Sequence, residues 1–185
     1  MTKRSRETLF NPTWEEMVES DPLLAFSFYL SGRVNVLLDL GDDIVALLDE
    51  GFAADCAYAD KIERASTIMW LWTLGAFEVV RTICQASSCF SPSAQTKFKS
   101  LKKSLSMARM PAAKMEIPGK KAPVSSDRSP DGWDVDGKDL LVGDPMALPH
   151  ISARTLLKEF GDVFASLSKA DVLGRHENSY SGSHS

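Results

Sequence analysis

Apolar positions recur at steps of three and four residues in four long segments, which is the spacing of one face of an α-helix. The most apolar segment runs from about Ala53 to about Ala86 and contains a run without charge, Ala65 to Phe77. Its apolar stripe consists of Ile62, Ala65, Met69, Trp72, Ala76, Val80 and Ile83. Because much of the rest of this segment is also apolar, we expect a central helix enclosed by its neighbours. The uncharged run is shorter than the roughly 20 residues that a membrane span needs, so no membrane segment is expected.

A first helix is predicted to begin at Asp21-Pro22 and to end at Gly51. Asp accepts hydrogen bonds from the free amides of a first helical turn, and Pro is favoured at the first helical position. Gly32 and Gly41 each cost about 1 kcal/mol relative to Ala in a helix interior, so the sequence allows a kink or a break near Gly41.

Two further amphipathic helices are predicted in the second half of the chain. One begins at Ser91-Pro92, ends at Pro111 and carries an apolar face of Phe98, Leu101, Leu105 and Ala108. The other begins at the cap residue Ser152 and extends to about Ala170. Its inward positions are Ile151, Leu156, Phe160, Val163, Phe164 and Leu167.

Between these helices, the composition shifts to Pro, Gly, Ser and Lys, and the stretch 117–132 is expected to be a mobile loop. The stretch Trp133 to Val142 is typical of a β-hairpin, with Asp136-Gly137 as a two-residue turn. The predicted register places Trp133 opposite Leu140 and Val135 opposite Lys138.

The pattern therefore predicts an all-α protein, an antiparallel four-helix bundle with a long, partly disordered connection and a small β-hairpin between the third and fourth helices. A chain of 185 residues fits one domain. We expect an N-terminal arm over residues 1–20, a single helical-bundle domain over 21–170 with a loop and hairpin insertion at about 111–150, and a disordered tail over 171–185.

The start of the chain and the cysteines indicate location. The first residues are charged and no apolar stretch of a secretory signal follows them, so we expect a cytoplasmic protein. Three cysteines are an odd number, and reduced thiols are expected rather than a disulfide framework.

The formal net charge of -4 conceals a strong segregation of charge. Residues 1–90 carry 7 basic and 14 acidic side chains, residues 91–128 carry 9 and 2, and residues 129–185 carry 5 and 9. The basic segment either meets an external anion or packs against acidic parts of its own fold or of a second copy. Charge alone leaves both readings open.

The residues predicted to bind nucleic acid or another anion lie in the basic segment 97–121: Lys97, Lys99, Lys102, Lys103 and Arg109. Lysines on the outer face of a helix can neutralise phosphates. The competing interpretation is a solvated helix face that balances the acidic body. Phe98 is the one aromatic residue within the segment, so stacking of single-stranded bases gains little support from the sequence.

A second candidate is a polar cluster at the edge of the core, formed by Arg33, Glu78 and Arg81. These residues could line a polar pocket or form structural ion pairs. A small-ligand pocket lined by Trp70, Trp72 and Phe77 is a further alternative to ordinary packing.

The sequence motifs of common catalytic centres are missing. No GxSxG, Walker-type GxxxxGK[ST], GxGxxG or HExxH string occurs in the chain. Cys84 and Cys89 would supply two of the four ligands of a closed zinc site, so no metal is predicted. We predict no catalytic residue and no cofactor.

The long antiparallel helices around the WLWTLGAF core resemble the HEPN-like helical domains of bacterial and archaeal defence proteins over about residues 22–116. Ribonucleases of that family carry an Arg followed, four to six residues later, by a His. The nearest string here begins at Arg109 and has Met115 in place of the His. The resemblance therefore implies a non-catalytic member that could still bind RNA or a partner.

The sequence favours a non-enzymatic helical-bundle interaction protein that forms a homo-oligomer or binds a protein partner. The alternative is an HEPN-like ribonuclease or nucleic-acid-binding protein that uses the basic segment 97–121.

Overall fold

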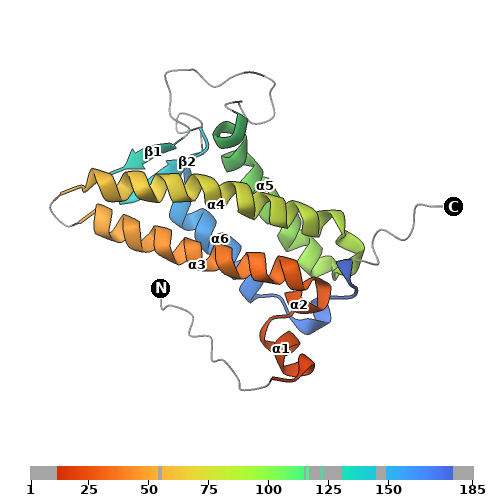
Figure 1. The fold of residues 1–185 in the computed structure, drawn as a ribbon. Helices are drawn as coiled ribbons and strands as arrows, with labels where there is room; N and C mark the ends of the chain where they lie inside the picture. The colour runs from red at the N-terminus through yellow and green to blue at the C-terminus, as the bar shows by residue number, and fades with distance from the viewer. Residues whose placement is uncertain are drawn as a thin grey trace.

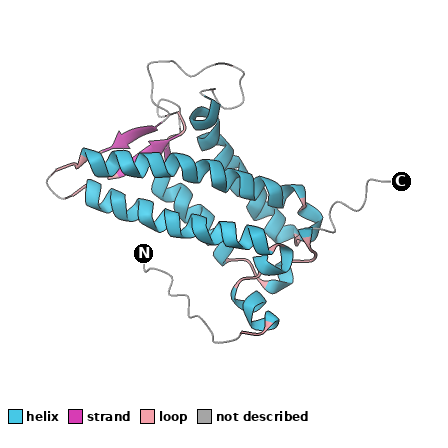
Figure 2. Ribbon diagram, viewed as in Figure 1, coloured by secondary structure: helices cyan, strands magenta, loops and turns pink. Residues whose placement is uncertain are grey.

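The computed structural model describes residues 12–53, 56–114, 116, 122, 131–144 and 149–176. These residues form a mostly helical fold with a small three-stranded antiparallel sheet (Figure 1). The predicted helical character is confirmed at this coarse level. The fold is not purely helical, because it contains a hairpin of two strands (Figure 2), and a third strand of two residues pairs with it.

Two long helices dominate the structure. Helices α3 (Phe28–Gly51) and α4 (Ala59–Gln85) lie side by side and run in opposite directions (Figure 1). Helix α5 (Pro92–Lys114) packs on α4, and α6 (Ala153–Ala165) packs on both α5 and α3. Helix α4 therefore has a neighbour on either side, as its apolar stripe predicts.

The predicted stripe of α4 is confirmed in full, since all seven of its residues are buried. The expectation of complete enclosure is wrong, because Trp70 is 46% exposed and Leu71 is 55% exposed. These two residues follow one another on the side of α4 that faces away from the stripe. A helix of this amphipathic kind needs covering on one side only.

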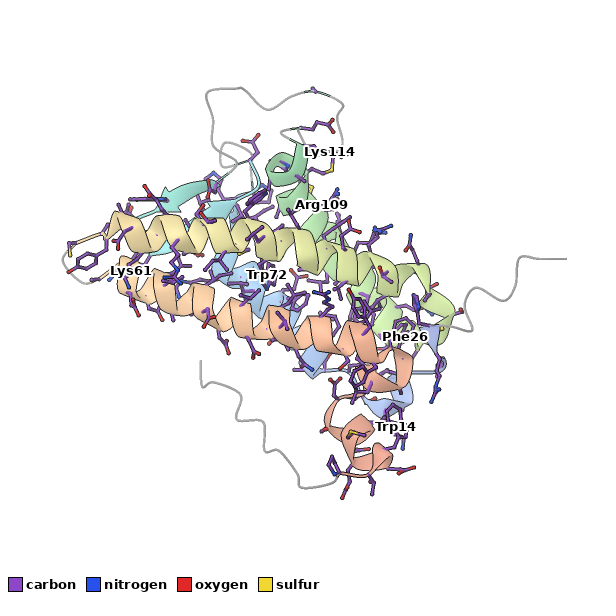
Figure 3. All side chains as sticks on the ribbon, viewed as in Figure 1. Trp14, Phe26, Lys61, Trp72, Arg109 and Lys114 are labelled. Carbon is purple, nitrogen blue, oxygen red and sulfur yellow. The ribbon has the colours of Figure 1, made fainter. Side chains whose placement is uncertain are left out.

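Aromatic side chains connect the helices inside the core. The ring of Trp72 on α4 (labelled in Figure 3) meets that of Phe160 on α6 at 5.2 Å between centroids, edge to face. The series continues through Phe164, Phe98 and Phe90 to Phe26, with ring centroids 4.7–5.6 Å apart. Such tilted and edge-to-face pairs add to the stabilisation from apolar burial.

The N-terminal end differs from the prediction. The expected arm contains α1 (Trp14–Ser20), which Thr13 and Glu16 start with a capping box. The helix that starts at Asp21-Pro22 is only the short α2 (Leu23–Phe26), because Ser27 adopts an extended conformation and caps α3 anew. The Asp21 carboxylate spans this break by accepting hydrogen bonds from Leu23 N at 3.2 Å and Ser31 Oγ at 2.6 Å.

Helix α3 continues without interruption through Gly41. A Cβ atom at Gly41 would lie 3.3 Å from Leu157 Cδ2 on α6, so this glycine permits close approach of the two helices. Gly75 plays the same role between α4 and α3, where a Cβ atom would lie 3.3 Å from Leu37 Cδ2.

The prediction that Pro111 ends the third helix is wrong, because α5 continues to Lys114. Proline lacks the amide that would bond to the carbonyl of Met107, four residues earlier. That carbonyl faces Gly143, where a Cβ atom would lie only 3.2 Å from the Met107 oxygen. Gly143 also has a φ of 91°, which favours glycine. The predicted start at Ser91-Pro92 is confirmed, since Ser91 Oγ accepts from Ala94 N at 3.2 Å.

The small sheet consists of β1 (Asp131–Asp134), β2 (Asp139–Val142) and β3 (Ile151–Ser152) in that order. The predicted pairing of Trp133 with Leu140 is confirmed. The turn spans Val135 to Lys138, and the positive φ of 51° falls on Lys138. Most of the predicted mobile loop 117–132 lies outside the described residues, although Asp131 and Gly132 belong to β1.

The C-terminal end is folded beyond the predicted boundary. Helix α6 begins after the predicted cap, Ser152, whose Oγ accepts from Thr155 N at 3.0 Å, but it ends at Ala165. The short helix η2 (Lys169–Asp171) follows, and Leu173 N donates to Cys89 O at 2.8 Å. The ring of His176 meets that of Phe26 at 5.3 Å. Residues 171–176 of the predicted tail therefore contact the rest of the fold, and residues 177–185 lie outside the described part.

By length and composition, one helix in the described part of the chain could cross a membrane, namely α4. Ten of its residues are buried within the fold. The central helix of a globular core satisfies the same two conditions.

Candidate functional site

The basic side chains of α5 differ in their exposure to solvent and in the helix that they approach. Lys99 and Lys103 are exposed and lie one turn apart, and Lys102 is half-buried. Lys97 is exposed and donates to Ser166 Oγ at 3.0 Å, so it leans toward the end of α6 instead. The other four predicted anion-binding residues, Lys99, Lys102, Lys103 and Arg109, remain candidates for a single anion-binding surface on α5.

Arg109 of α5, which is labelled in Figure 3, contacts two residues of α4. Its guanidinium lies 4.6 Å from the ring centroid of Phe77, and its Nη2 lies 3.7 Å from Glu78 Oε1. Stacking of this kind holds the planar cation at a fixed angle. Its Nε is buried and has no hydrogen-bond partner among the described residues.

Glu78 connects Arg109 with Arg81. The Nε of Arg81 donates to Glu78 Oε2 at 2.7 Å, and its Nη2 lies 2.7 Å from the same oxygen. The predicted cluster of Arg33, Glu78 and Arg81 is therefore formed in part, with Arg109 as a member that the sequence placed elsewhere. Arg33 is exposed and lies over the ring of Tyr29 at 4.9 Å, within its own helix.

We name this surface the basic face and define it by five residues. These are Arg81, Lys99, Lys102, Lys103 and Arg109. Cys84 of α4 lies near this face, since the charges of Lys102 and Lys99 both lower the pKa of its thiol. Burial acts more strongly in the opposite direction, so the pKa of Cys84 is raised overall.

The lysines of the basic face have no acidic partner in the described parts of the chain. The described ion pairs of the acidic residues go to Lys61, Arg81, Arg109, Arg154 and Lys158 instead. Glu78 is the acidic residue that contacts the basic face, through its two arginines. The interpretation that the lysines pack against the acidic body of the same copy therefore loses support.

Trp70 of α4 lies against the C-terminal end of α5, and the sequence did not predict that it would be exposed. Its Nε1 donates to Ala112 O at 3.2 Å, and the ring remains 46% exposed. The sequence offered no signal for this, since Trp70 sits in the most apolar run of the chain. Of the predicted pocket residues, Trp70 is exposed, Phe77 is covered by Arg109, and Trp72 is buried.

No group of three or more His, Cys, Asp or Glu side chains that could hold a metal occurs among the residues with a described placement. All three cysteines are free: Cys56 is exposed, Cys84 is half-buried and Cys89 is buried.

Comparison with known proteins adds no relative. No family model, no curated protein and no solved structure matches this chain. The resemblance to HEPN-like domains therefore stays a prediction, and Met115, the residue predicted to replace the His of that motif, lies outside the described residues.

Proposed function

We propose that this chain is a non-enzymatic interaction protein that self-associates through its charges. In this proposal, helices α3 to α6 form an antiparallel four-helix bundle, and the basic face of one copy contacts the acidic outer side of α3 on another. The proposal places the protein in the cytoplasm, where its three free thiols would stay reduced.

The observation that carries the proposal is the lack of acidic partners for Lys99, Lys102 and Lys103 in the described part of the chain. Exposed acidic side chains lie on α3, where Asp39 and Asp43 are one turn apart. Helix α4 separates α3 from α5, since it packs on both. One copy therefore cannot bring its own α3 acids onto its own basic face.

Such a contact joins two different surfaces, so it is heterologous and produces rings or open chains rather than an isologous dimer. Exposed charges are screened within about 8–10 Å at physiological salt. The assembly should therefore dissociate as the salt concentration rises.

The experiment is light scattering at several protein concentrations in about 50 mM and about 500 mM salt, where the Debye lengths differ severalfold. We expect the mean mass to exceed that of a monomer at low salt and to fall at high salt. The double variant Lys99→Glu/Lys103→Glu should be monomeric. The control Lys61→Glu/Arg64→Glu changes the net charge equally at the other end of α4 and should still associate. A wild-type protein that is strictly monomeric at low salt would overturn the proposal.

A second candidate is nucleic-acid binding by the same face, and the exposed ring of Trp70 favours it. Aromatic rings beside a basic groove stack single-stranded bases. Titration with a labelled single-stranded RNA tests this at two salt concentrations. If lysines contact phosphates, log K should fall with log salt by about 0.7 per contact. Absence of binding at about 50 mM salt removes this candidate without affecting the first.

A further inference from the structure

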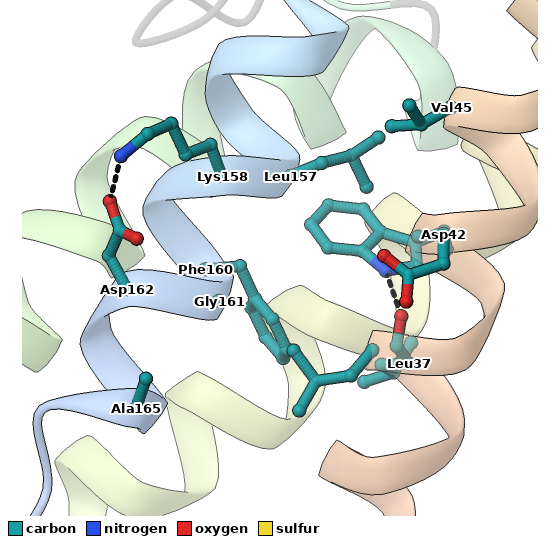
Figure 4. Close-up of a pocket in the computed structure, with 12 residues that line it drawn as sticks. Leu37, Asp42, Val45, Leu157, Lys158, Phe160, Gly161, Asp162 and Ala165 are labelled. Atoms are coloured by element: carbon teal, nitrogen blue, oxygen red, sulfur yellow. Dashed lines mark hydrogen bonds and ion pairs between the residues drawn. The ribbon is translucent and has the colours of Figure 1, made fainter. Parts of the chain in front are cut away.

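A pocket of about 210 Å³ lies between α3, α4 and α6, and none of the basic-face residues lines it (Figure 4). Its walls are apolar, with Leu37 and Val45 from α3 and Leu157 and Phe160 from α6. Trp72 of α4 also lines it, and its indole Nε1 is already satisfied by Leu37 O at 2.8 Å. An apolar ligand could therefore contact this ring without depriving it of a hydrogen bond.

Two glycines leave this space open. Gly41 and Gly161 belong to the lining, on α3 and α6 respectively. A Cβ atom at Gly161 would lie 3.8 Å from Leu38 Cδ2, which is an ordinary contact distance. Alanine would thus fit at this position without strain, and it would be favoured by about 1 kcal/mol in a helix interior. The glycine is a less stable choice that keeps the pocket larger.

The charges at the mouth of the pocket favour a cation. Lys158 and Asp162 form an ion pair on α6, one turn apart (Figure 4). Asp42 lines the pocket from α3, and no hydrogen bond or ion pair of its carboxylate occurs among the described residues. Since the lysine is neutralised by its own helix, the remaining charge at the mouth is negative.

The volume limits the size of the ligand. An engineered cavity of about 150 Å³ with apolar walls binds benzene, and a water molecule occupies about 30 Å³ of liquid. A pocket of about 210 Å³ therefore holds one six-membered ring with a chain of two or three atoms.

We infer that this pocket binds a small protonated amine that carries one apolar ring, with the ring against Trp72 and Phe160 and the ammonium group at Asp42. This inference does not depend on the proposed self-association, because it uses none of the basic-face residues.

The test compares three probes that share a phenyl ring: 2-phenylethylamine, 2-phenylethanol and 3-phenylpropanoate. Isothermal titration of the full chain should give the tightest binding for the amine, intermediate binding for the alcohol and the weakest for the carboxylate. In Asp42→Asn, the preference for the amine over the alcohol should fall by about fivefold, since an exposed ion pair contributes little more than that. Equal binding of the three probes, or no binding of any, would overturn the inference.

A second set of variants reduces the volume of the pocket instead of removing the charge at Asp42. Gly161→Val should weaken amine binding by about fourfold or more for each displaced methylene. Gly161→Ala should weaken it less and should raise the midpoint of thermal unfolding. Gly32→Ala is the matched control, because a Cβ atom at Gly32 meets nothing within 4 Å and this helix position is remote from the lining. It should raise the midpoint likewise and leave binding unchanged. Unaltered binding in both Gly161 variants would place the ligand elsewhere and refute the inference.

Discussion

Asp139 is the one carboxylate that is buried within the described residues, at 5% exposure. It accepts hydrogen bonds from Leu140 N at 2.8 Å, Arg154 N at 3.3 Å and the Ser152 hydroxyl, and it also faces the Arg154 side chain. Arg154 in turn lies 2.7 Å from Asp49 Oδ1 at the end of α3. A buried charge of this kind is tolerated because its partners replace water. Asp139 therefore connects β2 with α6 directly, and with the end of α3 through Arg154.

We predict that Asp139→Ala lowers the free energy of unfolding by about 3 kcal/mol, because it leaves buried donors without an acceptor. The control Asp49→Ala removes the exposed partner of the same arginine and should cost about 1 kcal/mol or less. Urea unfolding of both variants measures the difference. Equal losses would show that the hairpin does not depend on the buried carboxylate.

Asp171 gives a pH-dependent prediction. The Ser91 hydroxyl donates to Asp171 Oδ1 at 2.5 Å, and the Ser168 hydroxyl and amide donate to Oδ2 at 2.7 and 3.0 Å. These bonds lower the pKa of Asp171 below its ordinary value, with that from Ser91 as the largest cause. A carboxyl with a lowered pKa in the folded state stabilises the fold above its unfolded pKa, and this stabilisation is lost as the pH falls through the folded value.

Asp171→Asn should therefore cost about 1 kcal/mol near neutral pH. The difference between wild type and variant should shrink as the pH falls below about 4, the ordinary range of an aspartate. Unfolding midpoints from pH 7 to pH 2.5 provide the measurement. A difference that stays constant down to the acid limit would mean that the carboxylate form has no special role.

At the scale of elements, the spacing of apolar residues predicted the features that are decided within a single segment of the chain. The buried stripe of α4, the inner face of α5 and the register of the hairpin all follow from the order of apolar residues. The errors arose where distant segments decide the outcome. Helix α5 continues through Pro111, which is buried against the rest of the fold, and residues 171–173 are bonded to Ser91 and Cys89.

In the candidate site, too, features within one helix could be predicted from the sequence, and contacts between helices could not. The exposure of Lys99 and Lys103 could be predicted from the inner face of their own helix. The stacking of Arg109 on Phe77 and its link to Glu78 could not, because the two helices involved meet only in the folded chain.

Glycine substitutions in α3 test the packing of elements. A Cβ atom at Gly51 would lie 2.7 Å from Ile62 Cγ1, and Ile62 is fully buried. Gly51→Ala should lower the free energy of unfolding by about 1–3 kcal/mol through overpacking. The same change at Gly32, which has open space, should raise it by about 1 kcal/mol. Denaturant titration should thus give opposite signs; stabilisation by both would contradict the close approach of α3 and α4 at Gly51.

At the scale of the whole molecule, basic and acidic side chains lie on two different helices, α5 and α3, and α4 separates these helices. Helix α5 and Arg81 of α4 present the basic face, and α3 presents acids on its outer side. The net charge of -4 is modest, so attraction between unlike faces of two copies is not outweighed by strong repulsion between the copies. This arrangement is the physical basis of the proposed self-association.

Mixing two defective variants tests this claim most directly. Lys99→Gln/Lys103→Gln neutralises the basic face, and Asp39→Asn/Asp43→Asn neutralises the acidic one, so each should be monomeric alone. Together they still supply one intact face each, and sedimentation at low salt should show a one-to-one heterodimer that cannot grow further. Variants that remain separate on mixing, or that self-associate as the wild type does, would contradict the account.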